Sequence, residues 1–392
     1  MTAVYLNDVG ALCTLGRGAE MAEALFADRP HGVAATERYT PGRPLHLGCV
    51  EGPLPDLSHA PVGERSRSNA LFAAALAPLQ PAVERVLGQF GPQRVAVILG
   101  VSTAGLQEGQ QAAREHHASG TWPPGYDYAQ QEMGCAAAFI ARETGCHGPR
   151  YVISTACSSS AKALASGARL LRAGLADAVI AGGGDALSGF TIAGFGALES
   201  VSAARCNPLS VHRCGINIGE GAALFVMSRQ PGPVRLAGWG ETSDAHHMSA
   251  PDPSGRGAAG AMRQALHRAG IAPNTIDYVN LHGTATPQND AMESLAVSEV
   301  LGLDTPVSST KPLTGHTLAA AGAVEAALAW HTLVGNPQGR LPAHWWDGER
   351  DPALPPLRVV HPGEALGRPV RHVLSNSFAF GGSNASLVFA RE

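Results

Sequence analysis

Residues 151–167 read YVISTACSSSAKALASG and join an apolar run to a segment with helical spacing. The run Tyr151–Ser154 is typical of a buried strand, and beyond Ser158 apolar residues recur every three or four positions, as on one face of a helix. Cys157 falls in the turn between them. Because a thiolate at the first turn of a helix gains from the helix dipole and from free backbone N–H groups, we expect a lowered thiol pKa. The stretch predicts a strand–turn–helix elbow that presents a nucleophilic cysteine or, as the alternative, a buried structural one.

The same alternation of strand and helix continues along the 392 residues. Many of the apolar runs lack polar alternation, which is typical of strands covered on both faces. Helical spacing recurs at 258–269 and 319–332. Together these patterns predict a layered α/β fold with buried, alanine-rich helices. The other predicted strands are Ala3–Leu6, Val95–Gly100, Ala178–Ala181, Ala222–Ser228, Val234–Gly238, Tyr278–Leu281 and Ala385–Phe389.

A division of the chain is predicted near Gln230–Val234, where proline and glycine in SRQPGPV interrupt a strand pattern. It gives halves of residues 1–230 and 231–392, and each half has the length of a domain. The segment Pro342–Pro362 is rich in proline and is predicted to be a surface loop.

The amino-acid composition argues against several classes of protein. Hydrophobic residues make up 45% and charged residues 15%, which is enough for a large core, and the net charge of −4 does not favour nucleic-acid binding. Seven cysteines, an odd number without a CxxC pair, argue against a disulfide framework or a zinc site, so we expect reduced thiols and a cytoplasmic location. The N-terminus does not read as a signal peptide, and no membrane span is expected.

Two further stretches carry candidate chemistry. VNLHGTATPQND places His282 directly after a predicted strand, and SSTKPLTGHTLAAAG holds Lys311, one of only two lysines in the chain, five residues before His316. Taken singly, each histidine is more often a loop or helix-start residue, and Lys311 more often a solvated loop charge. Taken together with Cys157, two histidines at the ends of strands or helices are the ingredients of thiol-based acyl transfer.

HVLSNSFAFGGSNASLVFA is predicted to be strand, glycine loop and strand. A hairpin with Phe378 and Phe380 in the core is one interpretation. The other is a mobile flap over a pocket, with Gly381 and Gly382 as its hinge. AGGGDALS, residues 181–188, lacks the GxGxxG spacing and a following lysine, which excludes a nucleotide-phosphate loop.

Four motifs occur in order: TACSSS around Cys157, HGTATPQND around His282, TKPLTGHTLAAAGAVEA around Lys311 and His316, and SNSFAFGGSNASL. In this order and spacing the sequence resembles the elongating β-ketoacyl-acyl-carrier-protein synthases, the condensing enzymes of the thiolase-like superfamily. The resemblance implies two similar halves stacked as α-β-α-β-α, the first carrying the cysteine and the second the histidines, the lysine and a phenylalanine gate. It implies a homodimer, or a heterodimer with a chain-length-factor-like subunit. It also implies no metal or permanent cofactor, with substrates delivered on the phosphopantetheine of an acidic acyl carrier protein.

The implied reaction is the decarboxylative Claisen condensation of a malonyl thioester with an acyl group on Cys157, which extends a fatty-acid or polyketide/polyene chain by two carbons. His282 and His316 would bind the malonyl thioester and stabilise its enolate, and Lys311 would keep His316 neutral. The backbone N–H groups of Cys157 and Phe380 would form the oxyanion hole. The resemblance also implies contacts to pantetheine or the acyl chain at Thr284, Thr286, Phe378 and Phe380. It further implies supporting acidic residues at Glu325, Asp244 and Asp290.

The chain departs from the family pattern at three places. Ala379 stands between the two phenylalanines where glycine is usual, so gating is expected to be stiffer. Ala285 stands in HGTAT where glycine or serine is usual, and Cys214 stands where an acid is usual. Arg65 and Arg67 are candidates for carrier-protein docking on the resemblance.

Two alternatives stay open at this stage. One is a non-catalytic partner subunit like a chain-length factor, and Cys157 argues against it because such partners typically lack the nucleophile. The other is a thiolase-like acyltransferase or hydrolase. Lys311 together with His282 and His316 favours the decarboxylating branch instead.

Overall fold

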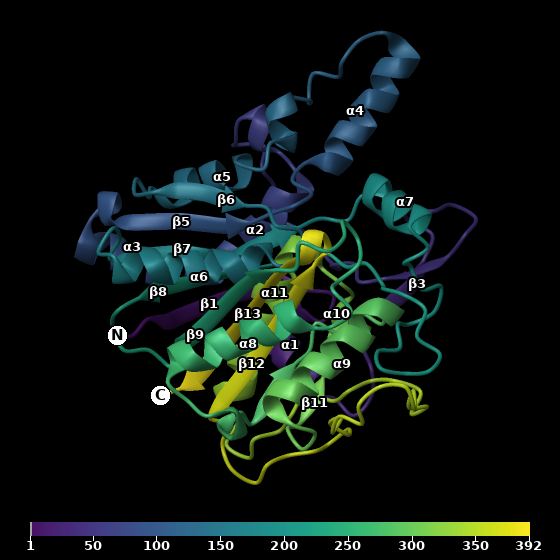
Figure 1. The fold of residues 1–392 in the computed structure, drawn as a ribbon. Helices are drawn as coiled ribbons and strands as arrows, with labels where there is room; N and C mark the ends of the chain where they lie inside the picture. Colours follow the sequence, from purple (N-terminus) through teal and green to yellow (C-terminus); the bar gives the residue numbers. More distant parts are fainter. Residues whose placement is uncertain (1) are drawn as a thin grey trace.

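The computed structural model describes residues 2–392, and its long strands lie in one mixed sheet (Figure 1). The strand order within the described residues is β11-β10-β12-β13-β9-β1-β8-β7-β5-β6, with β2 beside β1 and a separate β3–β4 pair. The strands are β1 Tyr5–Cys13, β2 Gly16–Arg17, β3 Ala34–Thr36, β4 Leu45–Leu47, β5 Val95–Gly100, β6 Arg150–Ile153, β7 Ala178–Asp185, β8 Gly221–Ser228, β9 Val234–Ser243, β10 Tyr278–Asn280, β11 Val307–Ser308, β12 His372–Ala379 and β13 Ser383–Arg391. The α-helices are α1 Ala19–Leu25, α2 Arg67–Leu76, α3 Gln80–Phe90, α4 Leu106–Ser119, α5 Cys135–Thr144, α6 Ser159–Arg172, α7 Gly189–Ala197, α8 Arg256–Ala269, α9 Pro287–Leu301, α10 Lys311–Thr314 and α11 Ala321–Leu333.

The sheet consists of two similar parts that meet at β1 and β9. On one side β6, β5 and β7 pair in parallel, and β7, β8 and β1 pair antiparallel. On the other side β11, β10 and β12 pair in parallel, and β12, β13 and β9 pair antiparallel. Within the sheet of the described residues, the two parts pair through Tyr5↔Arg235 and Leu6↔Val234. The predicted similarity of the two halves is therefore visible in the strand pattern.

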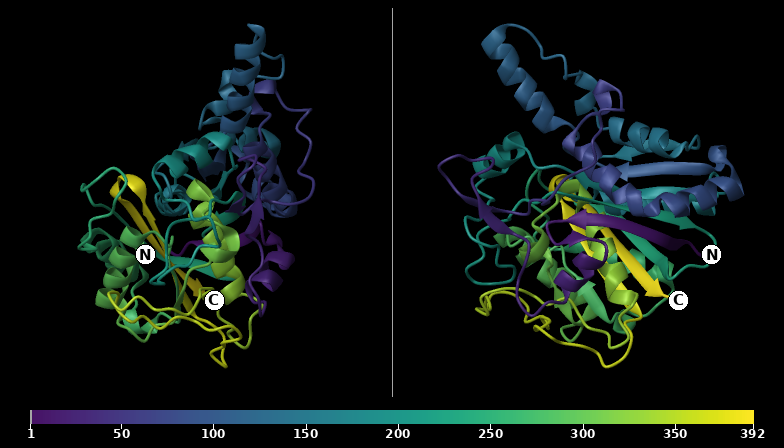
Figure 2. Two further views of the ribbon diagram at one scale, coloured as in Figure 1. Left: turned by 90° about the vertical axis from the view of Figure 1, so that its right-hand side faces the viewer. Right: turned by 180° about the vertical axis from the view of Figure 1, so that it is seen from behind.

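Alternate residues of one strand enter different cores. Val97 and Leu99 of β5 pack with α2, α3 and α5, whereas Ala96 and Ile98 face a central core that contains α6 and α11. On the other part of the sheet, β12 and β13 share that central core on one face and pack against α8 and α9 on the other. Both faces of each strand are thus covered by helices, which explains the fully apolar runs. The predicted five layers, α-β-α-β-α, are confirmed, with α6 and α11 in the middle layer (Figures 1 and 2).

Two elements differ from the sequence prediction. β1 runs to Cys13 through NDVG, which lacks a strand pattern; a side chain at Gly10 would meet the Ala75 carbonyl oxygen of α2 at 2.0 Å, so glycine permits this close approach. The polar helix α4 was not predicted and projects away from the layers (Figure 2). Residues 342–362 form a loop as predicted, but not a purely surface one, because His344, Leu357 and Val360 are buried.

The chain passes from β8 to β9 through residues 229–233. We propose this linker as the boundary between residues 1–230 and 231–392. Among the described residues, the helical run Arg67–Phe90 is long and apolar enough to cross a membrane by length and composition alone, and half of its most apolar window is buried in the fold. Core helices pass the same test, so this is weak evidence for a span.

Candidate active site

Cys157 lies at the elbow between β6 and α6. The strand ends at Ile153, α6 begins at Ser159, and the thiol is 6% exposed. Ala156, directly before the cysteine, has φ 49°, a left-handed conformation that costs a non-glycine residue on the order of 1 kcal/mol. The tight, strained turn aims the side chain of Cys157 at the ends of the elements on the other half. The predicted strand–turn–helix unit is therefore present.

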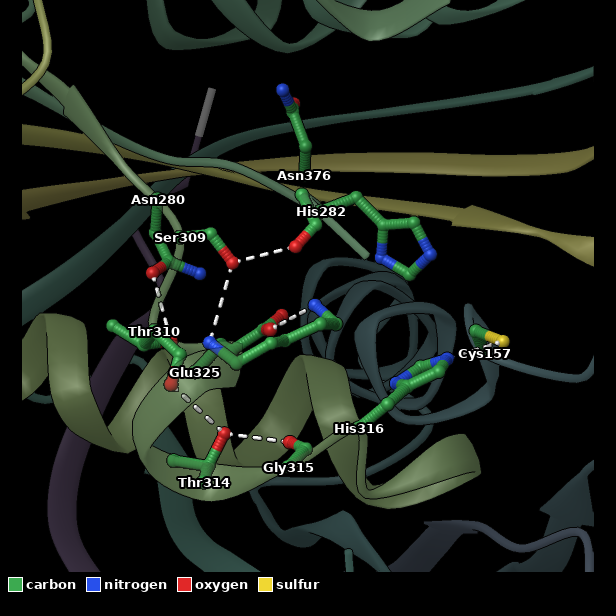
Figure 3. Close-up of polar contacts among 12 residues, drawn as sticks. Cys157, Asn280, His282, Ser309, Thr310, Thr314, Gly315, His316, Glu325 and Asn376 are labelled. Atoms are coloured by element: carbon green, nitrogen blue, oxygen red, sulfur yellow. Dashed lines mark hydrogen bonds and ion pairs between the residues drawn. The ribbon is translucent and has the colours of Figure 1, made fainter. Parts of the chain in front are cut away.

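Two imidazoles face the thiol. His316 Nε2 lies 2.9 Å from Cys157 Sγ, and the His282 ring stands edge-on to the His316 ring with their centroids 5.3 Å apart. His282 follows β10, and His316 lies between α10 and α11, so both come from the half that does not carry the cysteine. Both histidines are 2% exposed. Figure 3 shows His316 between Cys157 and the polar groups around Glu325, with His282 beside them.

Lys311 and Glu325 form a buried ion pair behind the histidines. Lys311 Nζ donates to Glu325 Oε1 at 2.6 Å, and the side chains are 1% and 2% exposed. Lys311 begins α10, and Glu325 lies in α11. Two charges removed from water are tolerated because each neutralises the other. Lys311 is therefore a buried cation and does not serve as a surface charge.

The pKa values in the cluster follow from burial and from this ammonium. Burial lowers the pKa of His282 and of His316 well below the usual range, and the positive charge of Lys311 lowers both further. Both rings are therefore neutral near pH 7. Burial also raises the pKa of the Cys157 thiol to about 11, although Lys311 and the backbone N–H groups of Phe380 and Cys157 oppose this rise. The expected lowering of the thiol pKa by the helix start is wrong for this resting state, because loss of hydration outweighs the helix end.

The same three side chains also provide a donor set that suits a metal. The sulfur of Cys157 and a nitrogen from each histidine lie within 4.8 Å of one another, and Cys and His are the donors that zinc prefers. However, the Lys311 ammonium, which already lowers the pKa of both histidines, would repel a further cation at this position.

The glycine loop after β12 closes over the thiol. β12 ends at Ala379, and Phe380–Gly382 form a tight turn, named the flap here, before β13 begins at Ser383. Gly381 and Gly382 have φ 80° and 72°, which require glycine. Ala379 has φ −103° and ψ 155°, an ordinary extended conformation, so its Cβ does not strain the closed flap. The N–H of Phe380 is directed at the Cys157 sulfur, which places it where an oxyanion hole would need it.

Two cavities meet at Cys157. The first is lined by the cysteine, both histidines, Phe378 and Phe380, together with Thr284 and Thr286, whose hydroxyl oxygens are 2.9 Å apart. The second is apolar, has a volume of about 490 Å³, and extends from Cys157 and Phe380 past Phe195, Leu198 and Leu318. Phe195 and Phe380 contact each other at the junction, with ring centroids 5.8 Å apart. Apart from Cys157 and Phe380, the sequence did not reveal the residues that line this second cavity. They come from separate segments of the chain, namely residues 102–106, Ala156, residues 190–198 and Leu318.

Asp290 and Asp244 lie outside the cluster around the thiol. Asp290 does not cap α9; its carboxylate accepts from the N–H groups of Leu209 at 2.8 Å and Ala285 at 3.2 Å. It thereby holds Ala285, which has φ 62°, in a left-handed turn beside the histidine loop. Asp244 accepts from Asn384 Nδ2 at 2.7 Å, next to the flap. Both carboxylates position loops.

Glu293 is a residue that the sequence reasoning missed. Its carboxylate accepts from the N–H groups of His282 at 2.8 Å and Gly283 at 2.7 Å, and from Asn376 Nδ2 at 3.1 Å. Burial raises its pKa to about 7. The signal was an acid three residues after Asp290, on the same face of the helix that follows HGTATP.

Arg67 and Arg65 differ in their availability to a partner. Arg67 makes a two-pronged ion pair with the fully buried Glu220, at 2.8 and 2.5 Å, so its charge is already neutralised. The ion pair therefore leaves Arg67 less available to a carrier protein, although its docking role stays a prediction. Arg65 is exposed and donates to the carbonyl oxygens of Ala60 and Ser58. Cys214 is exposed and 3.3 Å from Ser202 Oγ, away from the thiol cluster.

The five-layer fold with a cysteine at the start of its central helix defines the thiolase-like class. Residues 84–231 match the family described as beta-ketoacyl synthase, N-terminal domain, and residues 234–335 match beta-ketoacyl synthase, C-terminal domain. The 3-oxoacyl-acyl-carrier-protein synthase 2 of Synechocystis is 31% identical over 326 residues, which are 78% of this chain and 77% of that protein. The chain belongs to the beta-ketoacyl synthase family.

Two further relatives set the range of similarity. The mitochondrial 3-oxoacyl-acyl-carrier-protein synthase of Arabidopsis thaliana is 34% identical over 279 residues, which are 66% of this chain and 60% of that protein. The ketosynthase ApeO of Xenorhabdus doucetiae, solved in complex with its chain length factor ApeC, is 42% identical with a TM-score of 0.94. That comparison covers 100% of this chain and 98% of ApeO.

Proposed function

We propose that this protein catalyses the decarboxylative condensation of a malonyl group, carried on an acyl carrier protein, with an acyl group held on Cys157. The observation that carries the proposal is one cluster: a thiol 2.9 Å from a neutral histidine, a second neutral histidine at its edge, and a buried Lys311–Glu325 pair whose ammonium, added to burial, keeps both rings uncharged. A hydrolase could use a neutral histidine to activate water, so the reaction product separates the two activities.

The first step transfers the acyl group to Cys157. The sulfur attacks the thioester carbonyl, the oxygen gains negative charge, and the N–H groups of Cys157 and Phe380 stabilise it. The C–S bond to the carrier then breaks, and the thiol proton of Cys157 ends on the departing pantetheine sulfur. The apolar cavity beyond Phe195 receives the acyl chain.

The second step breaks the bond between the malonyl carbon and its carboxylate. Carbon dioxide leaves, and the electron pair enters an enolate whose oxygen accepts from His282 and His316. The Nδ1 atoms of both rings have no hydrogen-bond partner among the described residues, and a buried acceptor is less costly to leave unpaired than a buried donor. We therefore assign both ring protons to Nε2. Each well-placed donor of this kind contributes about 3 kcal/mol to the transition state.

The third step forms the new carbon–carbon bond. The enolate carbon attacks the acyl carbon on Cys157, the oxyanion hole is used again, and the thiolate of Cys157 leaves and takes up one proton from water, which restores the resting thiol. The product is a 3-ketoacyl chain, two carbons longer, on the carrier. A neutral histidine pair needs no net proton change during these steps, which explains why a fixed cation lies behind it.

The partners follow from the cavities and from the sheet edge. The narrow cavity lined by Thr284 and Thr286 suits the phosphopantetheine arm of an acyl carrier protein. β6 is an edge strand within the described residues. Phe190, which lines the apolar cavity, is 65% exposed, and Trp122, in the groove along α4, is 52% exposed. An unpaired strand edge and exposed aromatic side chains each favour a second subunit, either another copy or a chain-length-factor-like chain as in the ApeO complex. We place the protein in the cytoplasm, because its seven cysteines are free thiols.

Product analysis tests the proposal. The protein is incubated with malonyl-carrier and a ladder of acyl-carrier primers, with and without a candidate partner subunit. We expect 3-ketoacyl products two carbons longer than the primer and one carbon dioxide for each condensation. Release of free acids with no longer product would contradict the proposal and indicate a hydrolase.

A further inference from the structure

The second lysine of the chain, Lys162, is tied to the flap. It lies one turn into α6, is half-buried, and its Nζ donates to Ser383 Oγ at 2.6 Å. The same Ser383 oxygen accepts from Ser158 Oγ at 3.0 Å. The nearby Glu241 does not form an ion pair with Lys162, because both of its carboxylate oxygens accept from Arg169.

These contacts join the start of α6, which carries Cys157, to the base of the flap. Ser158 is the residue after Cys157, and Ser383 is the first residue after the flap, paired with Ala379 across the base of the hairpin. Between Ala379 and Ser383 lies Phe380, whose N–H faces the thiol. A bond at Ser383 therefore restrains the flap at its base, from the side of the helix that carries the nucleophile.

The residue type supports a specific contact. Arginine occupies almost every other basic position in the chain, and lysine survives only at Lys162 and Lys311. A compact ammonium can approach a single hydroxyl between a helix and a hairpin, whereas a planar guanidinium needs more room. The ion–hydroxyl bond is charge-assisted, and it is partly shielded from water.

We propose that Lys162 is a positioning residue that holds the flap closed over Cys157 through Ser383, and so fixes the Phe380 N–H beside the sulfur. Loss of the contact lets the flap move away, and the thiol loses one of the groups that stabilise its negative charge. The proposal rests on the proposed function only in taking Cys157 as the reacting thiol.

The rate of Cys157 alkylation by iodoacetamide, measured against pH, tests this without any condensation assay. The alkylated residue is identified by peptide mass spectrometry, since the chain has other free thiols. We expect Lys162→Met and Ser383→Ala each to slow alkylation roughly fivefold at a fixed pH and to move the profile to higher pH, the factor that corresponds to one ordinary hydrogen bond. Ser383→Thr keeps the hydroxyl and should restore the wild-type profile.

The double variant separates the contact from other effects. If Lys162 acts through Ser383, Lys162→Met in the Ser383→Ala background should add nothing further. An effect of Lys162→Met without any effect of Ser383→Ala would show an electrostatic influence of the cation and overturn the proposal. Unchanged alkylation in both variants would also overturn it, and neither result would bear on whether the protein condenses malonyl units.

Discussion

At the level of single residues, the decisive feature is a buried cation. Lys311 is one of only two lysines in the chain. Its side chain is 1% exposed, and its Nζ lies 2.6 Å from Glu325 Oε1. Four candidates could be predicted from the sequence, Cys157, His282, Lys311 and His316, because their motifs occur together in the family's order, and the structure brings the four close together. Glu293 could not, because its role depends on which backbone N–H groups its carboxylate meets after the chain has folded.

The ion pair predicts that arginine cannot replace Lys311. The larger, planar guanidinium does not fit the closed space, and an imperfect pair leaves the Glu325 charge uncompensated. A displaced cation no longer holds its charge behind His316, so we expect Lys311→Arg to lower the elongation rate about 100-fold, the loss that follows removal of one well-placed donor. Steady-state elongation measures it, with circular dichroism to confirm folding. Arg263→Lys, in an exposed pair with Glu299, is the matched control. A rate within threefold of wild type would contradict this account of Lys311.

The raised thiol pKa predicts a definite pH dependence. The pKa of Cys157 is about 11, above its usual value of 9.0, so the thiol form dominates at neutral pH and the thiolate fraction grows as the pH rises. The rate of Cys157 alkylation in the free protein should therefore rise about tenfold for each pH unit from pH 7 to 10. A plateau near pH 7 would indicate a thiolate–imidazolium pair instead, contrary to the lowered pKa of His316.

At the level of elements, local sequence patterns were enough to predict the elbow at Cys157 and the two strands that flank the flap. Strand–turn–helix at Cys157 and the paired β12 and β13 follow from hydrophobic runs and glycine. The start of β1 was predicted, as Ala3–Leu6, but its continuation to Cys13 was not, because it depends on the approach of α2 to Gly10. α4 was not predicted, because it has no apolar face of its own. The stiffness expected from Ala379 is not supported, because its conformation is one that any residue adopts.

The conformation of the flap predicts that Gly381 is the position where a side chain would introduce backbone strain. This residue has φ 80° with open space around it, so Gly381→Ala meets no atom but disfavours the closed turn by about 1 kcal/mol. We expect slower acyl transfer to Cys157, roughly fivefold, with little change in melting temperature. Pre-steady-state acylation followed by intact mass measures it. Ala379→Gly is the control and should change the rate less than twofold; a larger effect there would relocate the constraint to β12.

At the level of the whole molecule, one edge of the sheet is unpaired among the described residues, and it is the edge at which we propose a second subunit. The carbonyl oxygens of Pro149 and Ile153 accept from β5, so the N–H of Val152 points away from the sheet. This outward edge lies at the end of the strand order, and the acyl cavity shares Phe190 with an exposed aromatic groove along α4. The fold was predictable as two stacked halves, whereas the shape of this surface was not.

A proline at position 152 tests whether the outer edge of β6 takes part in subunit association. It removes an outward donor while leaving the bonds to β5 intact, so Val152→Pro should weaken subunit association and convert the assembly toward single chains. Light scattering after size exclusion measures the mass, and Val152→Ala controls for the lost side chain. An unchanged assembly in Val152→Pro would place the interface elsewhere.

The central claim is that Cys157 carries the acyl chain while the histidines drive decarboxylation, and one comparison tests both parts. Wild-type protein and Cys157→Ala are each given an acyl-carrier and a malonyl-carrier, with intact mass and carbon dioxide release recorded together. The wild type should gain the mass of one acyl group and form a longer product. Cys157→Ala should gain no mass and form no longer product, yet still release carbon dioxide, because His282 and His316 remain. A Cys157→Ala protein that still elongates would contradict the account.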